Sequence, residues 1–337
     1  MSTWQAIASG INECVICVGV EIQNRYPIMA DTYIYDEELK KPLSIPPSKK
    51  ILTHPEVVAK AKEHETQFAG QINAAHVMGV HWMKKSGKTL EEFRTELDKL
   101  SLLSHQKAVK SWDKRAKEIE PIWCPKLDEN GKPMLDENNE IAQDSSLSVL
   151  TERDESPRTN TSLEKLSQLR TIVGRKSKAF LTAGNSCPMS DGAAAHLWMT
   201  RELAEEYGFE IKATIVNYAV VGMDPILQLT GPIKAIPEVL KRANMTLDDM
   251  VFIEINEAFS PVIYACCYEL GLDWNDPNFN PWGGAIALGH PTGMTGCRLI
   301  GTNVHQLIDS GKEFALSSMC VGLGMGAATI VQNEHPK

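Results

Sequence analysis

The chain has 337 residues, of which 43% are hydrophobic and 23% charged, which is enough for two or three compact units with sizeable cores. Its formal net charge of -9 argues against a nucleic-acid-binding protein, but it still permits an anionic small ligand held by backbone N–H groups. No apolar run has the length of a membrane span, and the first residues lack a signal-peptide pattern. We therefore expect an intracellular protein.

The N-terminal residues predict a helix at 3–9 followed by a strand at 15–20. A strand of this kind is normally one of several in a sheet, so the beginning of the chain has the character of the middle of a domain.

From about residue 30 to residue 175 the pattern changes. Residues 89–92 (TLEE) form a capping-box motif that predicts the start of a long helix. One face of that helix carries Phe93, Leu97, Leu100 and Ser104. Residues 121–160 are acidic and rich in turns, and Asn130-Gly131 between short apolar runs predicts a hairpin. We expect this section to lie as an excursion on the surface of the core.

From residue 180 onward, expected strands and helices alternate. The expected strands cover residues 211–216, 251–255, 314–317 and 327–331, and the expected helices cover residues 238–243 and 296–308. Such alternation predicts a layered α/β domain.

The chain contains eight cysteines: Cys14, Cys17, Cys124, Cys187, Cys266, Cys267, Cys297 and Cys320. Cys14 and Cys17 form a C-x-x-C pair, which occurs in redox and zinc sites. The pair lies in an apolar run that predicts a buried strand, and neither a second C-x-x-C nor a nearby His completes a zinc set. We expect no metal site, and free thiols in a reducing compartment.

Three side chains in the C-terminal part combine into a candidate catalytic site. Asn256 follows an apolar strand, where its carboxamide can hold a water or an oxyanion. His290 lies among glycines before Pro291 and can act as an acid or base near neutral pH. Cys320 precedes a G-x-G-x-G turn, whose N–H groups are expected to stabilise a thiolate. Each residue alone has a structural explanation, such as a helix cap, a core imidazole or a buried thiol.

These residues fall within motifs of a known family. Residues 256–259 (NEAF), 283–293 (GGAIALGHPTG) and 320–326 (CVGLGMG) resemble the three C-terminal signatures of the thiolases, the acyl-CoA C-acyltransferases. Residues 182–187 (TAGNSC) with 190–195 (SDGAAA) are similar to the coenzyme A-contacting segment of that family. Shorter matches occur at residues 19–25, 104–108 and 230–232.

The resemblance implies an α/β fold: a thiolase-like layered αβαβα core of two similar halves, the first incomplete, with an inserted loop domain. Residues 1–33 and 178–209 would form what is present of the first half. Residues 34–177 would form the loop domain, and residues 210–337 the second half.

The resemblance also implies a role for each candidate residue. Cys320 corresponds to the thiol that moves a proton at the α-carbon of acetyl-CoA. His290 corresponds to the imidazole that activates the nucleophile and helps to bind the thioester oxygen. Asn256 corresponds to the residue that holds an oxyanion-hole water.

The implied substrate- and coenzyme A-binding residues are His76, Met78, Gly184, Ser186, Cys187 and Gly322. Cys187 stands where the family often has Ser, so a weaker donor replaces a hydroxyl. A substrate-contacting His is common in the family near Met78; both His76 and His81 flank that point, and the sequence leaves the choice between them open.

The nucleophile signature of the family has Cys, one residue, Ser and then Gln-Ala. Ser2, Gln5 and Ala6 match its tail, so we expect the acyl-accepting Cys and the strands before it to lie upstream of Met1. The implied reaction is thiolytic cleavage of a 3-ketoacyl-CoA, or Claisen condensation of acetyl-CoA with an acyl-CoA. The alternative is a non-catalytic thiolase-like subunit that binds a partner or acyl-CoA without turnover.

The remaining expectations concern partners and location. Acyl-CoA and coenzyme A are the expected small-molecule partners, no separate cofactor is expected, and the resemblance implies a homodimer or homotetramer. The cytoplasm is the favoured compartment; a mitochondrial or peroxisomal location would need a targeting segment, and the C-terminal His335-Pro336-Lys337 is not a peroxisomal tail. A Cys–His hydrolase is disfavoured, because it needs neither Asn256 nor a coenzyme A segment.

Overall fold

The computed structural model describes residues 2–23, 34–36, 41–43, 70–130, 132–173, 179–322 and 324–337. Its largest sheet has the strand order β7-β10-β9-β8. The strands are β7 (Ala213–Gly222), β8 (Phe252–Ile255), β9 (Phe314–Val321) and β10 (Met325–Asn333). β8 runs parallel to β9, and the other neighbours are antiparallel. The parallel pair places the C-terminal ends of β8 and β9 at the same edge of the sheet.

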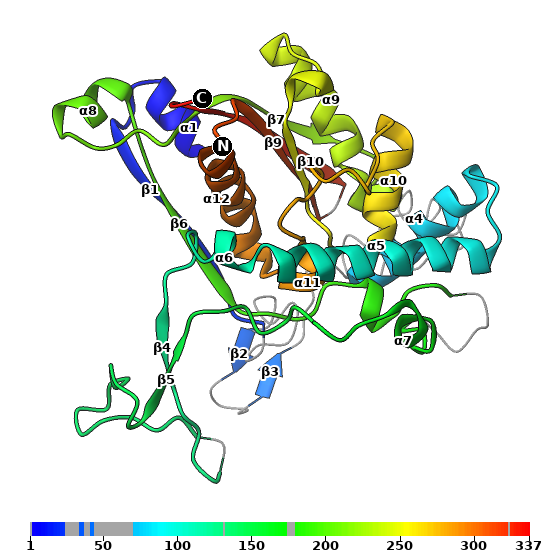
Figure 1. The fold of residues 1–337 in the computed structure, drawn as a ribbon, viewed down its shortest axis with the longest axis horizontal. Coiled ribbons are helices and arrows are strands. Elements are labelled where there is room, and N and C mark those ends of the chain that lie inside the picture. Colours follow the sequence, from blue (N-terminus) through cyan, green and yellow to red (C-terminus); the bar gives the residue numbers. More distant parts are fainter. Residues whose placement is uncertain are drawn as a thin grey trace.

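A central helix, α12 (Thr292–Ser310), lies between this sheet and a second, two-stranded sheet. The second sheet pairs β1 (Cys14–Glu21) with β6 (Gly192–Met199) in antiparallel register. Close approach of β1 to α12 depends on glycine, since a Cβ on Gly19 would collide with the carbonyl oxygen of Gly293. Both sheets therefore share one helix as their common layer (Figure 1).

Further helices pack on the opposite face of the four-stranded sheet. α9 (Pro232–Ala243) contacts β7, β9 and β10 directly, α10 (Ser260–Leu270) packs beside α9, and α4 (Gly70–Lys85) packs against α10. They bury the main apolar core, whose fully buried members include Met78, Phe180 and Ile263. α5 (Leu90–Lys110) packs against α10 and α11 (Ala285–Leu288). The layered α/β arrangement agrees with the alternation in the sequence.

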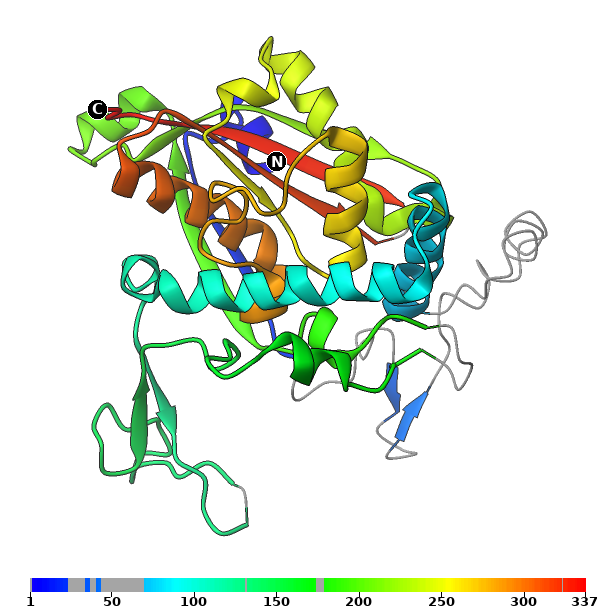
Figure 2. The same cartoon turned by 45° about the vertical axis from the view of Figure 1, so that its right-hand side comes forward.

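Short elements complete the described chain: α1 (Ser2–Ala8), α6 (Trp112–Arg115), α7 (Leu163–Ser167), η2 (Ala183–Asn185), α8 (Arg201–Glu206), η3 (Pro225–Thr230) and η4 (Leu247–Asp249). β2 (Ile34–Asp36) pairs with β3 (Lys41–Leu43), and β4 (Ile122–Pro125) pairs with β5 (Ser148–Thr151). The β4–β5 hairpin projects away from the body of the molecule (Figure 2). The boundaries of the two halves and of the loop domain, given above from the resemblance, stay a prediction. In the described ranges, no helix is long and apolar enough to cross a bilayer.

Two sequence expectations need correction. The run around Cys14 and Cys17 does form a strand, but β1 is not buried, because Ile16, Val18 and Val20 are 60–69% exposed on the face turned away from α12. The strand expected at residues 211–216 extends instead from Ala213 to Gly222, because backbone pairing with β10 carries it through the polar Asn217. Gly131 of the expected Asn130-Gly131 hairpin lies outside the described residues. On either side of it, Leu127 and Pro133 form an isolated antiparallel β-bridge.

The capping box that begins α5 is confirmed. Thr89 Oγ1 accepts from the backbone N of Glu92, and Glu92 Oε2 accepts from the backbone N of Thr89 at 2.8 Å. Phe93, Leu97 and Leu100 on the following face are buried, as expected.

Thr89→Ala is therefore expected to lower the free energy of unfolding by about 1 kcal/mol, because it removes the acceptor for a helix N–H. Urea denaturation measures this loss. Thr95→Ala, at an exposed position inside the same helix, is the matched control and should change stability little or slightly increase it. Equal losses in the two variants would contradict a specific capping role.

Candidate active site

Asn256 and Cys320 lie at the same edge of the four-stranded sheet. Asn256 follows β8, and its backbone N donates to the carbonyl oxygen of Ser318 at 3.0 Å, which continues the parallel pairing with β9. Cys320 lies two residues further along β9. Asn256 is 1% exposed and Cys320 is 7% exposed. The ladder thus brings a carboxamide and a thiol, 64 residues apart in sequence, to one end of neighbouring strands.

His290 reaches the same point from the loop that leads into α12. Its Nε2 lies 3.3 Å from Asn256 Nδ2, and its Nδ1 lies 2.7 Å from Thr295 Oγ1. The Thr295 hydroxyl donates its own proton to the carbonyl oxygen of Pro291, so it accepts from Nδ1–H. This network assigns the proton of neutral His290 to Nδ1 and leaves the Nε2 lone pair facing Asn256.

The backbone before His290 requires glycine. Gly289 has φ +96°, and a Cβ there would collide with Ser190 Oγ. Gln23 ties the same loops together, because its Nε2 donates to the carbonyl oxygen of His290 and its Oε1 accepts from Ser190 N, both at 3.1 Å. The imidazole therefore sits on a tightly constrained turn.

Burial controls the protonation states of the site. It lowers the pKa of His290 to about 4, with the nearby Arg298 charge acting in the same direction, so the imidazole is neutral at pH 7. Burial raises the pKa of Cys320 to about 12. The expectation that the glycine-rich turn would stabilise a Cys320 thiolate is therefore wrong in this structure, because desolvation outweighs the backbone hydrogen bond.

The segment expected to contact coenzyme A lies beside these residues. Cys187 N donates to the carbonyl oxygen of Ala258 at 3.1 Å, and Ser186 forms an antiparallel β-bridge with Phe259. The segment is therefore held against the residues that directly follow Asn256. Burial raises the pKa of Cys187 to about 12, and the neighbouring Cys320 thiol adds to that rise. Gly184 N donates to Thr182 Oγ1 within the same short turn.

The other expected contact residues occupy different surroundings. His76 on α4 is partly buried, and its ring lies 5.0 Å from that of Phe180, close to the coenzyme A segment in sequence. His81 is exposed on the same helix. Met78 is completely buried in the core, and Gly322 is exposed in the turn after β9. Of the two histidines left open by the sequence, His76 is the one placed beside this segment.

Comparisons with known proteins decide the family. Residues 1–202 match the family described as "Thiolase, N-terminal domain", and residues 209–333 match "Thiolase, C-terminal domain". The chain belongs to the thiolase family.

Solved thiolases share its fold. An acetyl-CoA acetyltransferase of Bacillus anthracis superposes with a TM-score of 0.75 at 28% identity, covering 99% of this chain and 75% of that one. Human mitochondrial 3-ketoacyl-CoA thiolase gives a TM-score of 0.73 at 29% identity, covering 98% and 76%. These structures confirm the thiolase-like layered α/β fold.

Curated thiolases are also similar in sequence. A beta-ketoadipyl-CoA thiolase of Acinetobacter baylyi is 38% identical over 260 residues, which are 75% of this chain and 60% of the relative. The peroxisomal 3-ketoacyl-CoA thiolase B of Rattus norvegicus is 38% identical over 247 residues, or 72% and 54%. The matched part of this thiolase-family chain thus spans about 60% or less of these relatives.

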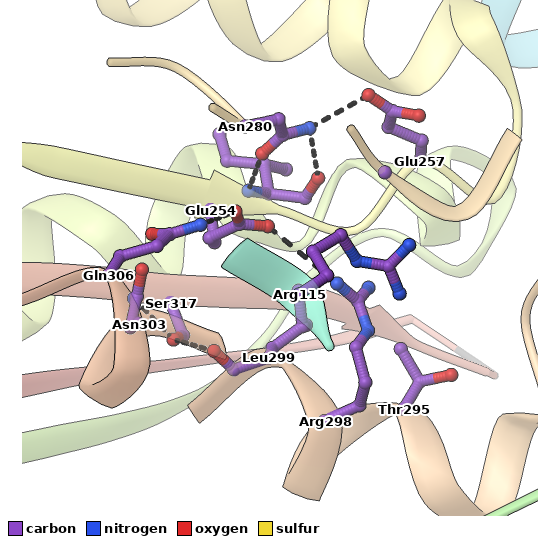
Figure 3. A network of polar contacts seen from close by, with 12 residues as sticks. Arg115, Glu254, Glu257, Asn280, Thr295, Arg298, Leu299, Asn303, Gln306 and Ser317 are labelled. Carbon is purple, nitrogen blue, oxygen red and sulfur yellow. Dashed lines mark hydrogen bonds and ion pairs between the residues drawn. The ribbon is translucent and has the colours of Figure 1, made fainter. Parts of the chain in front are cut away.

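Sequence reasoning missed the role of Glu257, the residue next to Asn256. Its carboxylate is buried and accepts from Ser104 Oγ at 2.6 Å, Asn280 Nδ2 at 2.9 Å and Ile286 N at 3.3 Å (Figure 3 shows the Asn280 bond). A Cβ on Gly284 would collide with this carboxylate. Glu257 therefore joins the Asn256 strand end to α5 and to the start of α11. The NEAF motif was the available signal.

A second buried network fixes α12 against β8. Gln306 Nε2 donates to Glu254 Oε1 at 2.7 Å, and Arg298 lies 3.8 Å from the same carboxylate (Figure 3). Burial raises the pKa of Glu254 to about 7, against the opposing effect of Arg298. Since β8 leads to Asn256 and α12 begins just after His290, this network sets the relative position of the two catalytic candidates.

Glu257→Ala is expected to lower the free energy of unfolding by about 3 kcal/mol, because three buried donors lose their acceptor. Urea denaturation measures the loss. Glu129→Ala, at an exposed loop position, is the control and should change stability by less than about 0.5 kcal/mol. Similar losses in both variants would contradict the joining role of Glu257.

Proposed function

We propose that this chain carries the proton-transfer and oxyanion-binding residues of a thiolase that acts on coenzyme A thioesters. The reaction is thiolytic cleavage of a 3-ketoacyl-CoA, or its reverse, the Claisen condensation of acetyl-CoA with an acyl-CoA. The observation that carries the proposal is the contact between Asn256 Nδ2 and His290 Nε2, at the sheet edge that also presents Cys320.

The neutral thiol of Cys320 suits the cleavage direction. A thiolate first adds to the β-carbonyl carbon; the bond between the α- and β-carbons then breaks, the acyl group stays on the attacking sulfur as a thioester, and the electron pair of the broken bond remains on the acetyl-CoA unit as an enolate. The Cys320 Sγ–H then gives its proton to the α-carbon and becomes a thiolate, which takes the proton of the incoming coenzyme A thiol. In condensation the same steps run backwards, and the thiolate removes the α-proton. Cys320 therefore has to alternate between two protonation states.

His290 and Asn256 support the charge that develops on the thioester oxygen. The Nε2 lone pair of neutral His290 accepts a proton from an attacking thiol, which converts Nε2 from an acceptor into a donor. That N–H, together with a water held by Asn256, can then stabilise the enolate oxygen. Asn256 Oδ1 is buried and has no partner among the described residues, which fits a position for such a water.

Proton exchange at acetyl-CoA tests this proposal without requiring acyl transfer. The protein is incubated with acetyl-CoA in D2O, and deuterium in the methyl group is measured by mass spectrometry. Enzyme-dependent incorporation that is lost in Asn256→Ala supports the proposal, and cleavage of acetoacetyl-CoA by added coenzyme A extends it to the complete reaction. Acetyl-CoA that binds without exchange would favour the non-catalytic alternative and overturn the proposal.

We further propose that the protein uses no separate cofactor, forms a homodimer or homotetramer and acts in the cytoplasm. The support for the assembly is the family resemblance, and light scattering after size-exclusion chromatography measures it. A monomer at micromolar concentration would contradict it.

A further inference from the structure

Two cysteines outside the catalytic site face each other across the β1–α12 contact. The Sγ atoms of Cys17 and Cys297 lie 3.7 Å apart, although 280 positions separate the residues in sequence. Cys17 is on β1 and Cys297 on α12, and both are partly buried free thiols. Neither is needed for the proton transfers at His290 and Cys320.

The surroundings hold this pair in place. Cys17 points to the face of β1 that packs on α12, while its neighbours Ile16 and Val18 point outward. One turn before Cys297, the backbone of Gly293 touches Gly19. A disulfide has an S–S bond of about 2.05 Å, so the sulfurs need to approach by only about 1.6 Å. Adjustment of the two side chains can supply most of this shift.

A base is also available. His196 on β6 is paired directly with Cys17 in the antiparallel ladder, and both side chains lie on the inner face of the sheet. Burial lowers the pKa of His196, so the imidazole is neutral and can take a thiol proton. Burial, together with the neighbouring Cys17 thiol, raises the pKa of Cys297 to about 11. Because His196 is paired with Cys17 on β6, Cys17 is the thiol with a base beside it and is assigned as the initial nucleophile. The described residues include no group of three or more ligands arranged to hold a metal, which favours thiol chemistry over a zinc site.

We propose that Cys17 and Cys297 form a redox-modification site, which a small disulfide such as oxidised glutathione converts into an intramolecular disulfide. Cys17 Sγ, after giving its proton to His196, attacks one sulfur of oxidised glutathione and releases the first glutathione thiolate. Cys297 Sγ then attacks the Cys17 sulfur of the mixed disulfide and releases the second. The two thiol protons end on the two glutathione molecules, and the protein loses two electrons.

The bond would act as a clamp at the start of α12. Thr295, two residues before Cys297, holds His290 Nδ1, and Glu21 at the end of β1 accepts from Thr292 Oγ1 and Gly293 N. Joining Cys17 to Cys297 covalently fixes β1 to the helix that positions the imidazole. Local unfolding of α12 should therefore be less frequent in the oxidised protein.

The test is oxidation of the full chain in glutathione redox buffers, followed by alkylation of free thiols and peptide mapping without reduction. The expected product has lost about 2 Da and contains a Cys17–Cys297 link located by fragmentation. Hydrogen exchange of the α12 amides should be slower in the linked protein and should return to its original rate after dithiothreitol. These readouts do not depend on turnover, so they are separate from the test of the proposed function.

Two variants sharpen the result. Cys17→Ser should lose the link, whereas Cys14→Ser, which changes the exposed cysteine of the same strand, should keep it. Glutathione adducts without the link, or a link from Cys297 to Cys14, would overturn the proposed pair. Unchanged exchange of α12 in the linked protein would overturn the clamp. If a variant folds poorly, the peptide map of the wild-type protein still decides whether the Cys17–Cys297 disulfide forms.

Discussion

Cys320→Ser is expected to slow α-proton exchange of acetyl-CoA by on the order of 10²- to 10⁴-fold, the range typical for loss of a positioned acid or base. A serine hydroxyl preserves the shape of the side chain but is too weak an acid to alternate between protonated and deprotonated states near neutral pH. Acetyl-CoA binding should remain, because Cys320 is 7% exposed and the change removes no charged contact. Deuterium incorporation measured beside binding by calorimetry separates the two effects.

The matched control is Cys267→Ser, the same change at a buried thiol on α10. It should retain near wild-type exchange. Equal loss in the two variants would point to damaged packing and contradict a proton-transfer role for Cys320.

The pH dependence of the same exchange follows from the buried thiol. Exchange needs the thiolate of Cys320, and burial raises the pKa of that thiol to about 12. Well below this pKa, the thiolate fraction rises roughly tenfold per pH unit. We expect the exchange rate to increase from pH 7 to pH 9 with no plateau. A plateau near pH 7 would mean that another group is the base.

Asn256→Asp should reduce exchange by on the order of 10²- to 10³-fold, because it removes a donor from the oxyanion site. It should also raise the pKa of His290 from about 4, since a carboxylate in place of the amide stabilises the imidazolium. A protonated Nε2 can no longer accept a proton from a thiol. The substitution therefore removes a donor of the oxyanion site and lowers the fraction of neutral His290 that can act as the base.

Histidine NMR titration of the variant checks the second effect directly. Asn160→Asp, at an exposed loop position, is the control and should change neither the His290 titration nor the exchange rate. A His290 pKa that stays near 4 in Asn256→Asp would contradict the contact seen between the two side chains.

The elements that position the site could largely be predicted from sequence. The capping box at Thr89, the strand before Asn256 and the helix after His290 carry their own local signals, and each is present. The exposure of β1 could not be predicted. Its outer face carries Ile16 and Val18, and an apolar run indicates a strand without saying what covers each face.

The motifs predicted that Asn256 and His290 belong to one site. They did not predict which other residues hydrogen-bond to His290. Thr295 and Gln23 have no local pattern that marks them; Gln23 reaches His290 across 267 positions of sequence. The protonation of Cys320 was also missed, because the adjacent glycine-rich turn predicted N–H groups that stabilise a thiolate, whereas the thiol is buried in the main apolar core. Tertiary packing decides such properties.

The pairing of β1 also has a consequence during synthesis. β1 ends at Glu21, but its partner β6 begins at Gly192 and α12 begins at Thr292. At 5–20 residues per second, a ribosome needs roughly 10–50 s to make the 170 or 270 residues in between. For that time β1 lacks its partner strand β6 and its packing helix α12 on the nascent chain. The strand is therefore a natural binding segment for chaperones acting at the ribosome, and faster translation should shorten its exposure.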